Sequence, residues 1–527
     1  MSHAPSGPAE NREPTLLETD VPLSQSLIWR LQRDFYAQRG LKAWNEDLVP
    51  SYITNNPFIA EIYAGIVAAF LQDCGSAAQL SPENPLRILE LGAGTGKFSY
   101  LFLRKLTALL QSNNLPLHLV RYCMTDTAES LLAESRQNAY LQEFVSSGIL
   151  EFEVFQAGQK YQQEARGPLV VIANYVFDSL PQDAFAIESG AIHEILVTTS
   201  AAANVETPHL KDLRFSYQNS SRAAKRYADD LWNGILEQYR TRLSAATVLF
   251  PASALQTLQQ LGDSGDGRML VLVADKGIAH EDDLALSPRA PSLDFHAGGQ
   301  CFSQLVNFDA IGKYFLGKGG EALLPSKHFT NLNLCAFIQR NPGDDFPATR
   351  KAYEQALSAF GPDDLFAIMS WLNGHLEEIS LFQALALLRL TRWDTIALTR
   401  LFPVIARLAR NATSERIDLR DAVLRTWKNH FPLTKDENVL AFYCGVILLE
   451  LRFFQEAYSM FRKSQQLYAP SATTSYNLGL CCLGLGQTRE ALELMREACD
   501  LDPNFEAARQ SRFKLEDQVR TGELELS

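Results

Sequence analysis

The sequence predicts an α/β domain with a parallel-rich sheet, followed by an all-α domain of helical repeats. Two observations support this fold class. Between residues 81 and 345, short apolar strands alternate with helical stretches, which is typical of a parallel sheet covered on both faces. After about residue 345 the strand patterns stop, and a 34-residue internal repeat appears among helices.

The composition limits the class of protein. The chain has 527 residues, 46% of them apolar, which suffices for several domains with buried cores. Its 48 Lys and Arg face 61 Asp and Glu, and the net charge of −13 disfavours nucleic acid and anionic membranes as partners. The eight Cys are too dilute for a disulfide framework and form no C-x-x-C pair, so no metal site is predicted.

The N-terminus carries no recognisable export signal. No basic start is followed by an apolar stretch, and the apolar runs at 62–71 and 439–449 are shorter than the ~20 residues that cross a bilayer. We therefore expect a cytoplasmic protein without membrane insertion. Residues 1–20 are polar and Pro-rich, and they predict a disordered tail.

The order of elements follows from the changing period of apolar residues. Helical spacing dominates residues 21–80, and the α/β domain is assigned to residues 81–345. Its strands are expected at residues 86–91, 117–124, 149–155, 169–173 and 268–274. A helical insertion at about 215–262 is expected before the last of these strands and is a candidate lid.

Six residues of the C-terminal region recur, with the same or a similar type, 34 positions later. The first set is Cys444, Gly445, Leu448, Ala457, Phe461 and Ser464, and the second is Leu478, Gly479, Cys482, Ala491, Met495 and Ala498. This period and pattern resemble the tetratricopeptide repeat, in which small residues let two helices approach closely. We predict such repeats at 431–515, and a helical connector or degenerate repeats at 346–430 that complete the solenoid.

A glycine-rich turn follows the first predicted strand. It reads Glu90-Leu91-Gly92-Ala93-Gly94-Thr95-Gly96 and leads into a helix. A dinucleotide fingerprint would need glycine where Lys97 stands, and a P-loop would need Ser or Thr where Phe98 stands. The remaining pattern, E-x-G-x-G-x-G, resembles the first motif of Rossmann-like methyltransferases that use S-adenosylmethionine. The alternative is a turn that binds no ligand.

The neighbouring residues suit that cofactor. Glycines let the backbone approach a ligand closely, and the helix N-terminus offers N–H groups and a partial positive charge to the methionyl carboxylate. An acid at the end of the second strand would accept the ribose hydroxyls, and the adenine would lie where the third strand ends. The cofactor site is therefore predicted at Glu90, Gly92, Ala93, Gly94, Gly96, Asp126, Thr127, Gln156 and Ala157.

Three further segments narrow the resemblance. They are Tyr52-Ile53-Thr54, Asn174-Tyr175-Val176-Phe177-Asp178-Ser179-Leu180-Pro181 and Val273-Ala274-Asp275-Lys276-Gly277. Together with the glycine turn they are similar to the MidA family of methyltransferases, which includes a mitochondrial complex I assembly factor that methylates protein arginine. The resemblance covers about residues 45–340. It implies Tyr52, Thr54 and Asn174 as cofactor-binding residues, and Asn174, Tyr175 and Asp178 as catalytic residues.

The chain departs from the family pattern at two positions. Tyr175 stands where the family places Glu, and Lys276 replaces the Tyr of an Asp-Tyr-Gly segment. Because forked carboxylate pairs hold a guanidinium best, losing one acid weakens the case for arginine as the acceptor. The segment that starts at Asn174 can also be compared with the Asn/Asp-Pro-Pro-Tyr motif of enzymes that methylate amide or amine nitrogens. A further alternative is plain packing of its aromatic rings over the end of the sheet.

The leading hypothesis is an S-adenosylmethionine-dependent methyltransferase that acts on a side-chain nitrogen of a protein docked by the helical repeats. Asp178 would orient that nitrogen and accept its proton. One alternative is a non-catalytic adaptor whose cofactor domain is vestigial or senses the cofactor. Another is a methyltransferase with a small-molecule substrate.

Overall fold

The computed structural model forms two compact units. Met1–Asn55 and Ile62–Asp363 make up the first, and Asn56–Glu61 and Asp364–Ser527 make up the second. The structure describes residues 14–40, 52–77, 80–127, 129–161, 167–202, 209–220, 227–286, 290–328, 331–358, 360–432 and 439–522. The predicted fold class, a sheet-rich α/β region followed by an all-helical region, is confirmed.

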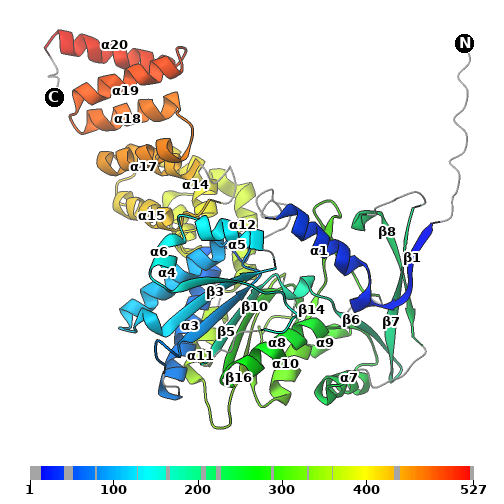
Figure 1. Ribbon diagram of the computed structural model, residues 1–527. Coiled ribbons are helices and arrows are strands. Elements are labelled where there is room, and N and C mark those ends of the chain that lie inside the picture. Colours follow the sequence, from blue (N-terminus) through cyan, green and yellow to red (C-terminus); the bar gives the residue numbers. More distant parts are fainter. Residues whose placement is uncertain are drawn as a thin grey trace, which may run out of the picture. The chain divides into compact units, whose positions relative to one another are not determined.

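The first unit is built on a seven-stranded sheet in the order β15-β16-β10-β5-β2-β3-β4 (Figure 1). Its strands are β2 (Leu86–Leu91), β3 (Val120–Asp126), β4 (Leu150–Val154), β5 (Leu169–Asn174), β10 (Met269–Asp275), β15 (Glu321–Leu323) and β16 (Asn333–Gln339). The first five of these run parallel and correspond to the five predicted strands. The other two pair antiparallel at one edge.

Side chains alternate between the two faces of this sheet, and each face is covered by helices. Leu89, Val171 and Val271 join one buried cluster with residues of α8 (Ala252–Ser264) and α10 (Phe308–Gly317). Figure 1 shows α3 (Pro57–Ala77) and α4 (Lys97–Ser112) on the other side. Burial on both faces explains why these strands read as continuous apolar runs.

A second, antiparallel sheet lies in the same unit. It contains β1 (Thr15–Pro22), β6 (Asp183–Glu188), β7 (Ala191–Ala201), β8 (Leu213–Asn219) and β9 (Ala245–Phe250). The long β7 pairs with β6, β1 and β8, and β6 pairs with β9. This sheet was not predicted. The β6–β7 hairpin is local, but β1 and β9 join the sheet through partners that are distant in sequence.

The second sheet corrects two expectations. Residues 15–20, expected in a disordered tail, belong to β1, where Leu17 and Val21 pack against a buried cluster. The region 215–262, expected to be a helical insertion, contains the end of β8 and all of β9 beside α7 (Asp230–Arg242) and α8. The remainder of the predicted tail, residues 1–13, and residues 221–226 of the predicted insertion lie outside the described residues.

Shorter elements complete the first unit. The helices are α1 (Ile28–Arg39), α5 (Glu129–Gln137), α6 (Gln142–Ser146), the short η3 (Phe177–Ser179), α9 (Glu281–Leu284) and α11 (Pro347–Leu357). The strands are β11 (Gly277–Ile278), which pairs with β14 (Val306–Asn307), and β12 (Asp294–His296), which pairs with β13 (Cys301–Ser303).

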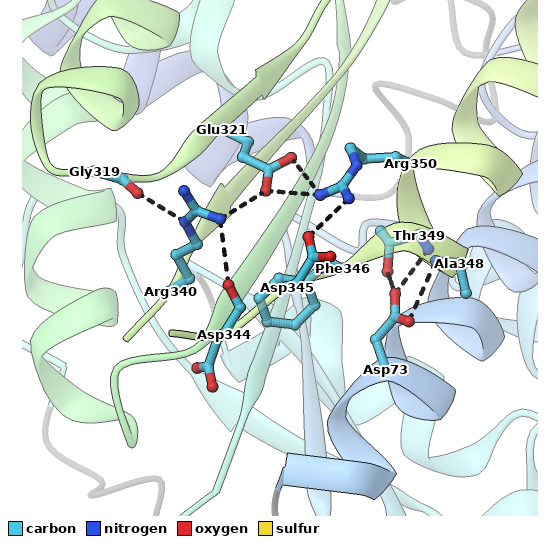
Figure 2. A network of polar contacts seen from close by, with 10 residues as sticks. All are labelled: Asp73, Gly319, Glu321, Arg340, Asp344, Asp345, Phe346, Ala348, Thr349 and Arg350. Carbon is cyan, nitrogen blue, oxygen red and sulfur yellow. Dashed lines mark hydrogen bonds and ion pairs between the residues drawn. The ribbon is translucent and has the colours of Figure 1, made fainter. Parts of the chain in front are cut away.

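Helix α11 is anchored by a polar network (Figure 2). The carboxylate of Asp73 on α3 accepts the backbone N–H of Ala348 at 3.2 Å and that of Thr349 at 2.8 Å. These N–H groups have no partner within the helix, so Asp73 caps α11 from a different element. At the same helix end, Glu321 of β15 accepts a bond from Arg350 at 3.0 Å, which ties α11 to the edge of the large sheet.

The described part of the second unit is helical. Its helices are α12 (Pro362–His375), α13 (Leu381–Leu390), α14 (Thr395–Ala409), α15 (Arg416–Lys428), α16 (Leu440–Glu450), α17 (Phe454–Leu467), α18 (Ala472–Gly484), α19 (Thr488–Leu501) and α20 (Glu506–Arg520). Both bounds of α17 recur 34 residues later in α19. The last helices, orange to red in Figure 1, stack in sequence order. Residues 433–438 of the predicted repeats lie outside the described residues.

Two glycines at equivalent positions explain why the same helix contact occurs in both repeats. A Cβ on Gly445 would lie 2.7 Å from the ring of Phe461, and a Cβ on Gly479 would lie 2.8 Å from the side chain of Met495. Glycine therefore permits the same close helix contact in both repeats.

Part of α3 has the length and composition of a membrane span. Pro57–Gly75 has a mean hydropathy of 1.3, and 56% of this stretch is buried inside the protein. The unbroken apolar runs did not indicate it, because Glu61 and Asp73 interrupt the sequence. Core helices of folded proteins pass the same test.

Candidate functional site

A cavity of about 600 Å³ lies at the carboxyl ends of β2, β3, β4 and β5. Ligands of open α/β sheets bind at this edge, and ~300–1,000 Å³ is the usual size of a small-molecule site. The predicted site residues that line it are Thr54, Glu90, Gly92, Ala93, Gly94, Asp126, Thr127, Gln156, Ala157, Asn174 and Tyr175. Three predicted residues, Tyr52, Gly96 and Asp178, are not part of the described lining.

The glycine turn adopts a backbone that other residues rarely tolerate. Gly92, Gly94 and Gly96 have φ values of 61°, 54° and 77°. A Cβ on Gly92 would lie 3.3 Å from Val176, and one on Gly96 would lie 3.1 Å from Met124. Gly96 therefore serves the packing of the turn rather than the cavity wall.

Backbone N–H groups of the glycine turn donate hydrogen bonds to other groups of the protein. Ala93 donates to the carbonyl of Thr125 at 2.8 Å, and Gly94 donates to Asp126 Oδ2 at 3.0 Å. Gly96 donates to the carbonyl of Ala93 at 3.1 Å. These bonds fix the turn against the end of β3, and they leave fewer donors for a ligand.

Asp126 is placed to bind a diol. Its side chain is buried and lines the cavity, and Oδ1 also accepts the N–H of Thr127 at 2.7 Å. Oδ1 accepts the hydroxyl of Thr127 as well, at 3.3 Å, and Oδ2 accepts the N–H of Gly94. A carboxylate offers about four acceptor positions, so the group can also receive a ligand hydroxyl.

Glu90 is a buried acid in the wall of the cavity. Its Oε2 accepts the hydroxyl of Tyr122 at 2.6 Å and that of Ser99. Burial raises the pKa of Glu90 to about 7, although these two hydrogen bonds oppose the shift. Glu90 is therefore partly protonated at neutral pH.

The raised pKa of Glu90 predicts a pH-dependent stability. The folded state holds this proton more tightly than the unfolded chain, so the free energy of unfolding should fall as the pH rises from about 4.5 to about 7. Glu90→Gln, which keeps an acceptor oxygen for Tyr122 and Ser99, should remove up to ~3 kcal/mol of this fall. Urea unfolding of both proteins at pH 5 and pH 8 measures the difference. Equal pH dependence in the two proteins would contradict it.

The turn after β5 combines a polar side chain with a strained backbone. Asn174 Oδ1 accepts the hydroxyl of Tyr63 at 2.7 Å, and its Nδ2 is buried without a hydrogen-bond partner among the described residues. Tyr175 has a φ of 53°, a conformation that costs a non-glycine residue ~1–3 kcal/mol. Such strain is typical of functional turns. Burial, with the nearby charges of Asp275 and Asp178, raises the pKa of Tyr175, so its hydroxyl stays protonated.

Asp178, which was expected to contact an acceptor group, is not part of the described cavity lining. It is buried, and its N–H donates to Asp275 Oδ2 at 3.0 Å. Burial raises the pKa of Asp178 to about 6, and burial and the charge of Asp178 raise that of Asp275. The two buried carboxyl groups also hydrogen-bond to each other and cannot both ionise easily, so the pair holds a proton. The bond from the Asp178 N–H fixes the Tyr175 turn to the end of β10.

Sequence reasoning missed one wall of the cavity. It is formed by α1, through Trp29, Gln32, Arg33, Tyr36 and Ala37, and by Ser253 and Gln256 of α8. The α1 residues follow the spacing of one helix face, which was a usable signal. The sequence could not show that this face meets a turn more than 50 residues away. Among the described residues, no group of three or more His, Cys, Asp or Glu could hold a metal ion.

Two parts of the chain match family models. Residues 66–283 match the model described as "Putative S-adenosyl-L-methionine-dependent methyltransferase", and residues 472–505 match the tetratricopeptide repeat. No curated protein matches the chain.

Three solved structures with a distant likeness come from Burkholderia thailandensis. An uncharacterized protein from Burkholderia thailandensis is 18% identical, with a TM-score of 0.40, and the match covers 62% of this chain and 88% of that one. A second protein from that organism, bound to S-adenosyl-homocysteine, is 16% identical with a TM-score of 0.40 and coverages of 61% and 93%. An O-methyltransferase family protein from the same species is 11% identical with a TM-score of 0.27 and coverages of 60% and 70%.

The chain thus contains an S-adenosylmethionine-dependent methyltransferase domain and a tetratricopeptide repeat. The residues around the cavity fit that cofactor. Gly92 and Gly94 of the glycine turn line the cavity without a side chain, Asp126 offers acceptors for ribose hydroxyls, and the volume lies in the usual range of small-molecule sites.

Proposed function

We propose that this S-adenosylmethionine-dependent methyltransferase methylates a nitrogen in the side chain of a protein, and that the helical repeats bind this protein. One observation carries the proposal: Asn174 and the strained Tyr175 line the same cavity as Glu90 and Asp126. An amide side chain and a protonated hydroxyl therefore lie next to the residues that would hold the cofactor.

The cofactor supplies a methyl group that its sulfonium already activates. The protein has then to hold the nucleophile in line and exclude water. Asn174 and Tyr175 would orient the acceptor nitrogen by hydrogen bonds. Asp178 acts in this proposal as a positioning residue, because it holds the Tyr175 turn from behind through Asp275.

The charged residues of the cavity lining indicate which kind of acceptor nitrogen fits. In the described lining, the carboxylates are Glu90 and Asp126, and we assign both to the cofactor side. A guanidinium acceptor would need a further pair of acids. The MidA-type relationship is therefore proposed for fold and cofactor, while an amide or amine nitrogen suits this cavity better than arginine.

The repeats support a protein substrate, because stacked helix pairs present an extended surface to peptides or helices. In this proposal, residues 81–345 carry the catalytic domain, 346–430 connect, and 431–515 dock the substrate. A cytoplasmic location is part of the same proposal.

Removal of the repeats tests the docking role. A chain that ends at residue 430 should bind S-adenosylmethionine with unchanged affinity, while kcat/KM for the protein target falls at least ~10-fold, since docking energy is lost. Transfer of tritiated methyl groups into a cell extract, sorted by size, measures this. The unchanged cofactor affinity is the control for folding.

Two outcomes would contradict the proposal. Equal protein labelling by both chains would exclude docking by the repeats. Label that appears only in small molecules would exclude a protein substrate.

A further inference from the structure

Helix α1 crosses the cavity described above. Its hydroxyl-bearing Tyr36 interacts with Ser179, just after β5, and with Cys301 of β13. At the end of α1, a Cβ on Gly40 would lie 3.9 Å from Leu131 of α5, which follows β3. The helix therefore runs from the end of β5 toward the end of β3. Arg33 lies one turn before Tyr36 and also lines the cavity.

Arg33 is the unsatisfied charge of this site. Its side chain is exposed at the cavity and forms no hydrogen bond or ion pair with another described residue. Among the described lining residues it is the one cation, and it faces two acids, Glu90 and Asp126. An arginine kept at a cavity wall without a partner suits an anionic group of a ligand.

The charges of the described lining suit a ligand carboxylate beside Arg33. S-adenosylmethionine carries a sulfonium, an ammonium and a carboxylate. Arg33 is the one described lining residue with a positive charge, so it is the counterpart for that carboxylate. Without Arg33, the methionyl carboxylate would enter a cavity whose described side chains offer no cation and whose Asp126 repels it.

The backbone donors expected to bind this carboxylate are largely occupied. The N–H groups of Ala93, Gly94 and Gly96 already donate within the protein. Gly96, which precedes α4, is not in the described lining. Donors from another element would therefore add to those that remain at the start of α4.

A second donor lies beside Arg33. Gln32 is 2% exposed and lines the same cavity. Its Oε1 accepts the N–H of Phe302 at 2.9 Å, which fixes the orientation of the amide, and its Nε2 has no hydrogen-bond partner among the described residues. A buried amide donor without a partner is unfavourable, and a ligand oxygen would satisfy it.

We infer that Arg33, supported by Gln32, binds the methionyl carboxylate of S-adenosylmethionine. Helix α1 is then part of the cofactor site, although it precedes the glycine turn by about 50 residues in the sequence. The inference concerns the cofactor alone and does not depend on the identity of the acceptor.

A cofactor analogue without the carboxylate tests this assignment. Arg33→Ala in the full chain should raise the Kd of S-adenosylmethionine by about 10- to 100-fold, the range for a charge-assisted hydrogen bond. It should change the Kd of decarboxylated S-adenosylmethionine by less than about twofold, within the range of a neutral surface substitution. Calorimetric titration measures both values. Arg33→Lys keeps the positive charge but loses the two-pronged guanidinium. Its Kd for S-adenosylmethionine should lie between those of wild type and Arg33→Ala.

Arg30→Ala is the matched control, because Arg30 is exposed on the same helix and is not in the described lining. It should bind both ligands as the wild type does, and thermal unfolding should show that all variants fold. Equal weakening of both ligands by Arg33→Ala would mean that Arg33 does not act on the carboxylate. Unchanged affinity for both would assign Arg33 to the acceptor or to solvent. Either result overturns the inference.

Discussion

Replacing Gly94 by Val is expected to abolish cofactor binding, with a rise in the Kd of S-adenosylmethionine of at least ~100-fold. Gly94 has a φ of 54°, which a β-branched residue adopts only with strain, and its N–H donates to Asp126. Because Gly94 lines the cavity, the new side chain would also occupy space that the ligand needs. Calorimetric titration measures the loss, and thermal unfolding shows whether the variant folds.

Gly190→Val is the control for backbone strain. Gly190 joins β6 to β7 with a φ of 79°, and a Cβ there would have no atom within 4 Å. This variant should bind the cofactor normally despite a similar strain in its turn. A folded Gly94→Val protein with wild-type affinity would place the cofactor elsewhere.

The second large effect is expected at Asp126. Asp126→Asn keeps the shape of the side chain and one acceptor, but it removes the charge and places an amide donor near the Gly94 N–H or the ligand. Since hydrogen bonds to a charged group contribute ~1.5–3 kcal/mol, the Kd of S-adenosyl-homocysteine should rise by ~10- to 100-fold.

An analogue without ribose hydroxyls shows whether Asp126 binds these hydroxyls directly or affects cofactor binding in a general way. If Asp126 binds these hydroxyls, the 2′,3′-dideoxy analogue should bind wild type much more weakly than S-adenosyl-homocysteine. In Asp126→Asn the two ligands should differ much less, because the interaction is already lost. The same ratio of affinities in both proteins would show that Asp126 contacts another part of the ligand.

Much of the cofactor site could be predicted because its signals are local. The glycine turn, the preceding strand and the following helix are contiguous in sequence. Asp126 stands at the end of the next strand. Buried parallel strands also produce apolar runs that need no knowledge of their partners. The 34-residue repeat was visible for a similar reason, since Gly445 and Gly479 each face a residue 16 positions later.

What the sequence could not show depends on distant pairing. Strand β1 exists because β7, about 180 residues away, completes its hydrogen bonds, and half of its own residues are polar. The wall formed by α1 lies more than 50 residues before the glycine turn that shares its cavity. Asp178 was assigned to the acceptor because it follows β5, but it is buried beside Asp275 and is not part of the described cavity lining. The strain at Tyr175 is a backbone property that no residue pattern predicted.

The most direct test of the account is a calorimetric titration of the full chain with S-adenosylmethionine. The account predicts one saturable site per chain at the ends of β2 and β3, present in wild type and Gly190→Val and lost in Gly94→Val. No binding to the wild-type chain, or undiminished affinity in folded Gly94→Val and Asp126→Asn proteins, would contradict it.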